Sequence, residues 1–288
     1  MKYSTLFLCL FMSFSIFGQG KKDSRQSTDI PEMRTMFSHT SANDDGTFTS
    51  TTYSHPIHYM KNGDWYPIDL SIQSNNDENR DSYSMVNATN NFKTYFPSDI
   101  TDGLFCQLSP NVHIKDMLFG KMYFESNSVM FPAEFMHSSN PIFTANKAKY
   151  VGVYQGVDLE VTMNESRRKA DYIIRSSDFL NQIPSSADFL VFEELIELPK
   201  NWSAIHKNNK VYLINSDGVV QASYDTPLLK DANHLNSNQK KSFKGKQNVQ
   251  NIFFELVPSG SNYRLLTKVR LDWIRSNERV FPLTIDPD

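Results

Sequence analysis

The chain has 288 residues and a mass of 33.2 kDa, enough for one large β domain or two ordinary ones, which excludes a peptide-sized or fibrous protein. Charged residues make up 21% and apolar residues 39%, a globular balance, and the formal net charge is −3 at pH 7. Such a small negative charge provides no overall field for gathering nucleic acid or an anionic membrane. Aromatic residues reach 13% with only 11 glycines, a composition typical of sheets with polar outer faces.

The first 20 residues have the pattern of a signal peptide. Lys2 is their single charged residue, the apolar run Leu6–Met12 follows, and a small residue, Gly18, comes near the end. The run is too short for a membrane-spanning helix, which needs about 20 apolar residues. Cys9 lies inside the run, so we expect cleavage near Gly18 or Gly20 and no lipid anchor. The sequence predicts a secreted protein with no membrane span, and a buried N-terminal helix is the alternative.

Cleavage at that place leaves Cys106 as the only cysteine of the mature chain. No intramolecular disulfide is then available, and stability must come from a hydrophobic core. Cys106 lies in the apolar stretch Leu104–Leu108, where a thiol packs as a small hydrophobic side chain. No neighbouring cation or histidine is evident in the sequence to lower its pKa, so we do not expect a reactive nucleophile.

Short β-type segments separated by turn residues follow the leader, and few windows show a helical stripe. The clearest hairpin joins Pro56–Met60 to Trp65–Ile72 through Asn62 and Gly63, which favour the positive φ angles of a tight reversal. The polar stretch Ser74–Asp81 is expected to be a solvated loop. Further strands are expected at Tyr83–Val86, Phe92–Phe96, Val112–Ile114, Met122–Glu125 and Val129–Phe131.

The weakly patterned stretch Pro132–Lys147 is the predicted boundary between two lobes. Asp231–Gln250 is a long polar insertion. Strands are expected beyond the boundary at Tyr150–Met163, Lys169–Arg175, Ser185–Leu198, Val211–Ile214 and Val219–Tyr224, and a three-stranded meander at Asn251–Val257, Tyr263–Trp273 and Val280–Ile285.

The predicted fold is mostly β, an antiparallel β-sandwich-like architecture of one or two lobes. Its predicted parts are a signal peptide (1–20), a flexible leader (21–33), a β-rich lobe (34–140) and a β-sandwich-like lobe (148–288). One intertwined sandwich is the alternative, if the hairpin near Trp65 pairs with strands after Tyr150.

Four segments, in this order along the chain, resemble a known pattern. Asn62–Leu70 resembles a G-x-W-x-P-I-D segment, and Tyr150–Leu159 resembles Y-x-x-V-Y-x-G-V-D-L. Arg168–Ile174 is similar to the K-x-x-I-I/V strand that follows, and Phe281–Pro287 to a closing Y/F-P-x-T-I-D-P segment. This set resembles the N-terminal extracellular β-sandwich region of large secreted bacterial surface proteins, the kind that precedes Rhs-like, DNRLRE-type or type IX secretion sorting modules.

The resemblance spans about residues 34–288 and implies a non-catalytic surface role, at the outer cell surface of a Gram-negative bacterium or outside the cell. It assigns no catalytic residue and implies structural roles for Trp65, Asp69, Gly156, Asp158, Asp286 and Pro287. The family usually continues into downstream modules after the aspartate-proline segment. This sequence stops at Asp288, so we expect either the leading part of a longer protein or a stand-alone exported domain.

Three of these aspartates, Asp69, Asp158 and Asp286, stand between apolar residues. Because side chains alternate along a strand, each carboxylate is expected on the face opposite to its neighbours, bonded to turn amides or to a nearby Arg or Lys. Convergence on a structural Ca²⁺ is the alternative, but no D-x-D-x-D-G loop supports it. We therefore expect no cofactor and no metal.

Carboxylate catalysis lacks a clear pair in this sequence. Glycosidases need two carboxylates that face each other across about 5–9.5 Å. Glu193 and Glu194 are adjacent, so on a strand they point to opposite faces, and nothing distinguishes Asp188 or Glu197 as an acid or a nucleophile. The seven histidines form no helical zinc pair, and no G-x-S-x-G or phosphate-binding loop occurs.

Exposed aromatic side chains are the remaining candidates for binding, because their rings stack on sugars. We expect core packing for Trp65 and Trp273 and exposure for Trp202, so Trp202, together with the Asp231–Gln250 insertion, is the predicted binding residue. The basic segment Lys240–Lys246 is the alternative contact for polyanions.

The sequence thus predicts an exported, non-catalytic, surface or adhesion-associated binding or structural domain. Its expected partners are glycans or other surface proteins, and not nucleic acid. A secreted polysaccharide-processing enzyme, or an accessory domain of one, is the alternative.

Overall fold

The computed structural model describes residues 27–127, 129–233 and 250–287. Strands account for 55% and helices for 9% of these residues, in several antiparallel sheets, so the predicted mostly β, sandwich-like fold is confirmed. The expected signal peptide lies outside the described residues. Part of the expected flexible leader is ordered, because β1 (Ser27–Asp29) pairs with β2 (Ser38–Asn43) and the 3-10 helix η1 (Pro31–Met33) lies between them.

The large sheet contains ten of the described strands. In spatial order they are β22 (Ile252–Ser259), β23 (Asn262–Arg270), β17 (Phe189–Glu197), β10 (Val112–Ser126), β9 (Leu104–Ser109), β8 (Lys93–Pro97), β7 (Tyr83–Asn87) and β6 (Gln73–Ser74), with β11 (Val129–Met130) and β12 (Glu134–Phe135) paired to β10. The 3-10 helices η2 (Glu78–Arg80) and η3 (Ile100–Asp102) lie in its loops.

A second sheet, six-stranded within the described residues, packs against the large sheet. Its order is β13 (Pro141–Thr144), β14 (Lys147–Tyr154), β15 (Val157–Met163), β16 (Arg168–Ile174), β24 (Leu283–Asp286) and β21 (Leu228–Lys230). Because successive side chains of a strand point to opposite faces, one set of apolar side chains on β15 and one on β17 face each other between the two sheets. There the rings of Tyr172 and Phe192 stack at 4.1 Å between centroids.

Strands from both sides of the expected lobe boundary share the large sheet. β10 pairs with β17 in a register that places Phe124 opposite Leu190, and β17 pairs with β23. The cut near Pro132–Lys147 therefore separates segments that the structure joins. The chain follows the intertwined alternative, although through β10 and β17 rather than through the hairpin near Trp65.

A third sheet, the side sheet, covers the other end of the same inner face. It consists of β18 (Ser203–Lys207), β19 (Lys210–Ile214) and β20 (Val220–Tyr224). Val211 and Leu213 of the side sheet pack with Ile196 and Leu265 of the large sheet. Two covers thus lie on one sheet, and the buried side chains of Asp116 and Glu194 lie where the covers meet.

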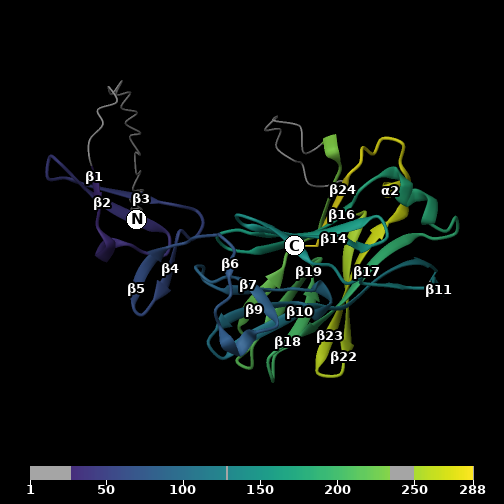
Figure 1. Ribbon diagram of the computed structural model, residues 1–288, viewed down its shortest axis with the longest axis horizontal. Helices are drawn as coiled ribbons and strands as arrows, with labels where there is room; N and C mark the ends of the chain where they lie inside the picture. Colours follow the sequence, from purple (N-terminus) through teal and green to yellow (C-terminus); the bar gives the residue numbers. More distant parts are fainter. Residues whose placement is uncertain (1–26, 128, 234–249, 288) are drawn as a thin grey trace, which may run out of the picture.

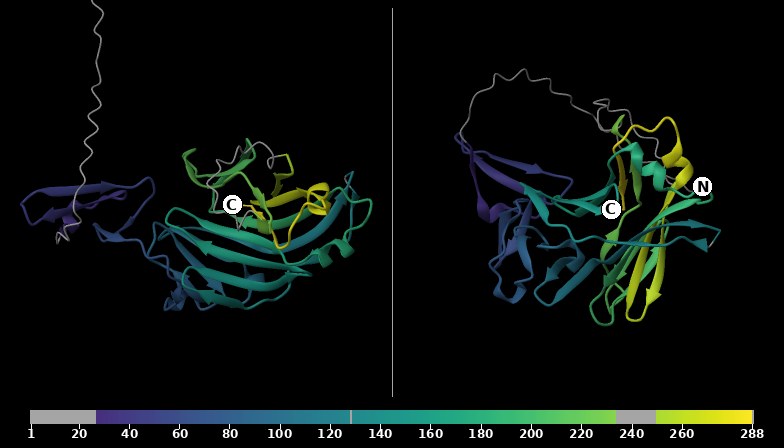
Figure 2. Two further views of the ribbon diagram at one scale, coloured as in Figure 1. Left: turned by 90° about the horizontal axis from the view of Figure 1, so that it is seen from above. Right: turned by 45° about the vertical axis from the view of Figure 1, so that its right-hand side comes forward.

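The N-terminal strands lie at one end of the molecule, where the hairpin of residues 58–67 adjoins the sandwich (Figures 1 and 2). They are β1, β2 and β3 (Phe48–Thr52), and the hairpin of β4 (His58–Lys61) and β5 (Asp64–Pro67). The predicted turn is confirmed, with φ of 54° at Asn62 and 95° at Gly63. Core packing of Trp65 is not observed: its side chain is half-buried on β5, outside the hydrophobic clusters of the described residues.

The expected C-terminal meander is wrong in its third strand. β22 and β23 form the predicted hairpin, but the chain then turns through the short helix α2 (Leu271–Arg275) and crosses to the opposite sheet. There β24 pairs with β16 and β21. Trp273 is buried in the main core as expected, although it lies on α2 rather than on a strand.

Candidate functional site

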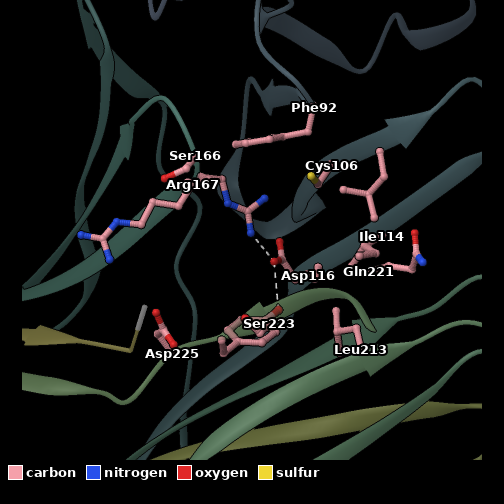
Figure 3. A pocket seen from close by; sticks show the side chains of 14 residues that line it. Phe92, Cys106, Ile114, Asp116, Ser166, Arg167, Leu213, Gln221, Ser223 and Asp225 are labelled. Atoms are coloured by element: carbon pink, nitrogen blue, oxygen red, sulfur yellow. Dashed lines mark hydrogen bonds and ion pairs between the residues drawn. The ribbon is translucent and has the colours of Figure 1, made fainter. Parts of the chain in front are cut away.

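The candidate site is a cavity of about 370 Å³ where the large sheet, the second sheet and the side sheet meet, called here the junction cleft. Its walls come from β9 and β10, from the turn before β16, and from β20. Side chains that line it include Phe92, Cys106, Asp116, Ser166, Gln221 and Ser223. In Figure 3 Asp116 lies near the middle of the cleft, with Cys106 on one side and Ser223 on the other.

A double irregularity in β10 positions Asp116. The register from Lys115 opposite Glu197 to Lys121 opposite Glu193 contains two shifts, each adding one residue to β10. Within it Met117 has φ of 58° and Phe119 has φ of 49°, a left-handed backbone that costs such residues of order 1 kcal/mol or more. Strain of this kind clusters at functional sites, and bulges re-aim side chains there.

Asp116 is held by partners from the two other sheets. Arg168, the first residue of β16, donates from Nη2 to Asp116 Oδ2, and the hydroxyl of Tyr224 donates to the same oxygen at 3.1 Å. The side chain of Asp116 is 4% exposed and that of Arg168 is 13% exposed. This buried ion pair therefore connects all three sheets.

The protonation of these partners suits the contacts. Burial lowers the pKa of the Arg168 guanidinium, but the charge of Asp116 more than offsets this effect and the net shift is upward. Burial, reinforced by the same carboxylate, raises the pKa of Tyr224 well above its ordinary value. Arg168 therefore keeps its charge, and Tyr224 keeps the proton that it donates.

One polar atom on each side of the pair is left over. Asp116 Oδ1 and Arg168 Nη1 are buried and have no hydrogen-bond partner among the described residues. Leaving a buried donor or acceptor unpaired costs about 1–3 kcal/mol. The pair thus leaves one acceptor and one donor unsatisfied, on residues that line the junction cleft.

A second, smaller cavity of about 30 Å³ adjoins the junction cleft. Asp116, Arg168 and Tyr224 line both cavities, whereas Glu194 of β17 and Pro287 line only the smaller one. Burial, and then the negative charge of Asp116, raise the pKa of Glu194 to about 8, against a smaller lowering effect of Arg168. Glu194 is therefore protonated at neutral pH.

Cys106 lines the junction cleft but is not activated. Burial raises the pKa of its thiol to about 11, with only a partial opposing effect from Arg168. A protonated thiol is a poor nucleophile. This agrees with the sequence analysis, in which Cys106 is a small packed side chain.

Asp158 has the partners that its position between apolar residues leads one to expect. Its Oδ1 accepts a hydrogen bond from the backbone N–H of Gly152 at 2.8 Å, and its Oδ2 lies 3.1 Å from Lys149 Nζ. Arg175 Nε approaches Oδ1 at 3.7 Å. The side chain is 3% exposed, so these contacts compensate its burial on β15.

Replacing Asp158 by alanine is expected to lower the free energy of unfolding by about 1–3 kcal/mol, because the N–H of Gly152 loses a charged acceptor. Urea unfolding measures this change. Lys147→Ala is the control, since it breaks an ion pair to Glu160 whose side chains are 44% and 28% exposed and should cost less than about 1 kcal/mol. An equal loss in both variants would contradict the role of Asp158.

The other two aspartates are also bonded locally. Asp286 Oδ2 lies 2.9 Å from Lys169 Nζ and 2.8 Å from Lys230 Nζ. Asp69 Oδ1 accepts from the N–H of Ser71 at 2.9 Å. Within the ranges that the structure describes, no three His, Cys, Asp or Glu side chains gather as metal ligands.

The remaining predicted residues lie apart from the junction cleft. Gly156 forms the turn between β14 and β15 with φ of 76°. Trp202 is not the exposed platform that we expected: it is half-buried and packs against the cluster containing Val211. Most of the insertion Asp231–Gln250, with Lys240–Lys246, lies outside the described residues.

Glu193 and Glu194 point to opposite faces of β17, as strand geometry predicts. Glu193 accepts from the hydroxyl of Tyr123 at 3.2 Å and lies 3.3 Å from Arg264 on the outer face. Glu194 lies inside, beside Asp116 and Arg168.

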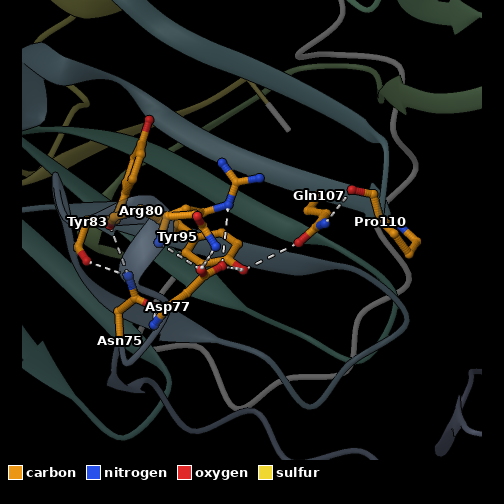
Figure 4. Close-up of polar contacts among 8 residues, drawn as sticks. Asn75, Asp77, Arg80, Tyr83, Tyr95, Gln107 and Pro110 are labelled. Carbon is orange, nitrogen blue, oxygen red and sulfur yellow. Dashed lines mark hydrogen bonds and ion pairs between the residues drawn. The ribbon is translucent and has the colours of Figure 1, made fainter.

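A further polar cluster lies on the outer face of β7–β9 (Figure 4). The guanidinium carbon of Arg80 lies 3.9 Å from the ring centre of Phe105, and the hydroxyl of Tyr95 is 3.4 Å from Asp77 and 3.3 Å from Gln107. The stretch Ser74–Asp81, expected to be solvated, is thus partly packed onto the sheet. Its groups are bonded to one another, so this cluster is a structural contact.

Sequence patterns do not identify Asp116, Arg168, Glu194 and Tyr224 as site residues. The alternation in Phe189–Glu197 places three apolar residues beside Glu194 on one face and three beside Glu193 on the other, so it predicts burial for both carboxyls without distinguishing them. The others carry no local signal, since they come together only across three sheets.

No helix in the described part of the chain is both long enough and apolar enough to cross a bilayer. Comparisons with protein-family models, with curated proteins and with solved structures found no match. The resemblance to the N-terminal region of secreted surface proteins therefore stays a prediction.

Proposed function

We propose that this chain is an exported, non-catalytic binding domain of a surface or adhesion-associated system, and that its ligand occupies the junction cleft. The observation that supports this most is the Asp116–Arg168 pair, which is buried at the meeting of three sheets and retains one unpartnered atom on each side. The strained backbone that positions Asp116 adds support, because strain of this kind clusters at functional sites. Export rests on the pattern of residues 1–20.

The alternative is a secreted polysaccharide-processing enzyme. It is favoured by one observation: a protonated Glu194 lies beside Asp116, and a pair of carboxyls with separated pKa values is how glycosidases divide the roles of acid and base. Against it, Glu194 lines the smaller cavity of about 30 Å³ and not the junction cleft. An acid in that place does not reach a sugar bound in the cleft, so binding is the preferred function.

Filling the cleft is expected to weaken ligand retention strongly. Ser166 lies in an exposed turn at the cleft wall, so Ser166→Trp should lower the affinity for glycans on a surface-glycan array by about tenfold or more. Ser50→Trp, on the exposed strand β3, is the matched control and should bind as the wild type does.

Turnover is measured on the same glycans by chain-length analysis after incubation. We expect retention with unchanged chain length. If the wild type shortens the glycans and Glu194→Gln does not, the non-catalytic function is contradicted. If the wild type, Ser166→Trp and Ser50→Trp retain the glycans equally, the cleft is not the binding site.

A further inference from the structure

We propose that the junction cleft takes an uncharged carbohydrate of one or two sugar residues, whose hydroxyl groups bond to Asp116 Oδ1 and Arg168 Nη1. This inference rests on the proposed function, since it names the ligand class of the same site. Four observations carry it: the two unpartnered atoms, the charge balance of the walls, their apolar surface, and the volume of the cleft.

The unpartnered atoms call for a group that both donates and accepts. Asp116 Oδ1 can only accept and Arg168 Nη1 can only donate. A hydroxyl group does both, and two neighbouring hydroxyls of a sugar satisfy the acceptor and the donor together. Hydrogen bonds to charged partners are about twice as strong as those between neutral groups, which favours this site for a polyol.

The charges of the cleft walls cancel. The walls contain two acidic residues, Asp116 and Asp225, and two arginines, Arg167 and Arg168. Asp116 is paired with Arg168, and Asp225 forms an ion pair with Lys210. An anionic ligand at Arg168 would lie against the carboxylate of Asp116, and a cationic one at Asp116 would lie against the guanidinium, so a neutral ligand fits best.

The rest of the walls suits the apolar face of a sugar ring. Phe92, Leu108, Ile114 and Leu213 contribute apolar surface, while Ser223 and Gln221 add polar groups at the exposed strand β20. In Figure 3 Phe92 lies across the cleft from Ser223, so that a ring can lie between an aromatic side chain and polar groups. The volume of about 370 Å³ is near the lower end for small-molecule sites, which restricts the ligand to one or two sugar units.

The experiment compares matched ligands on the mature protein by isothermal titration calorimetry. Neutral mono- and disaccharides are titrated beside the corresponding uronic acids and sulfated sugars, at about 50 mM and about 500 mM salt. We expect neutral sugars to bind and their Kd to change by less than about twofold with salt, because no net charge is neutralised.

Two variants locate the contact. Arg168→Lys keeps a positive charge beside Asp116 but lacks the planar second nitrogen, so it should weaken neutral sugars by about tenfold. Ser166→Trp should remove binding, while Ser50→Trp should leave it unchanged. Circular dichroism confirms that each variant is folded, and if Arg168→Lys is not, Ser166→Trp still decides the site.

The outcomes separate the two proposals. Suppose that acidic sugars bind, that Ser166→Trp abolishes this binding, and that neutral sugars do not bind. The proposed ligand class is then wrong, while the proposed binding function stands. If no sugar of the panel shows binding that depends on Ser166, both are wrong. Binding of neutral sugars that is lost in Ser166→Trp supports both.

Discussion

Replacing Arg168 by methionine is expected to lower the free energy of unfolding by about 3–5 kcal/mol, because it leaves the carboxylate of Asp116 buried without its charge partner. Asp116 is 4% exposed, and of the partners in the described part of the chain only the hydroxyl of Tyr224 remains to compensate its burial. Equilibrium unfolding in urea, followed by tryptophan fluorescence, measures the change.

Two further variants decide whether the loss comes from the uncompensated charge. Arg264→Met breaks an ion pair to Glu193 in which the arginine is 42% exposed. It should cost less than about 1 kcal/mol, because Glu193 keeps Lys121 at 3.6 Å and the hydroxyl of Tyr123 at 3.2 Å. The double variant Arg168→Met/Asp116→Leu should recover much of the loss, because no buried charge remains. A small loss in Arg168→Met, similar to that of Arg264→Met, would show that the pair is not buried in solution.

Glu194 is expected to make the protein less stable as the pH rises toward about 8. Below pH 4.5, the ordinary pKa of this carboxyl, both folded and unfolded states hold its proton. Between that value and about 8 the unfolded chain releases the proton while the folded protein retains it, so stability falls by up to about 1.4 kcal/mol per pH unit. Above about pH 8 both states are ionised and this loss stops increasing.

The variant Glu194→Gln removes this contribution, since an amide stays neutral at every pH. The free energy of unfolding of the variant, minus that of the wild type, should rise through the same pH interval and then stay constant. The total rise should be no more than about 5 kcal/mol. Urea unfolding at a series of pH values measures the difference. Glu197→Gln, at the exposed end of the same strand, is the matched control, and the same pH profile in both variants would contradict the assignment to Glu194.

The parts of the fold that the sequence predicts are those determined by neighbouring residues along the chain. Asn62 and Gly63 adopt the left-handed backbone of a tight hairpin because their own chemistry permits it, and the turn ending at Gly218 between β19 and β20 follows the same rule. The pairing of β10 with β17 has no such cause. It depends on which of many apolar strands meet across the core, and a weakly patterned linker between them suggested a boundary instead.

The candidate site could not be predicted from the sequence for a related reason. Asp116 and Tyr224 are separated by 108 positions and Asp116 and Arg168 by 52, so no spacing connects them. The high aromatic content favours Trp202 as a binding residue, but its side chain packs against the side sheet. The sequence indicates burial of Glu194 only in the same measure as it does for Glu193, because each shares a strand face with three apolar residues.

The strand β24 has a consequence for how the protein reaches its folded state. It lies between β16 and β21, and it pairs Ile285 with Tyr172, more than a hundred positions earlier. The second sheet therefore cannot close while the chain is being synthesised until residue 286 is available, and contacts over such a sequence separation form slowly. Until then β16 and β21 lack the partner that lies between them, and unpaired strand edges of this kind favour aggregation.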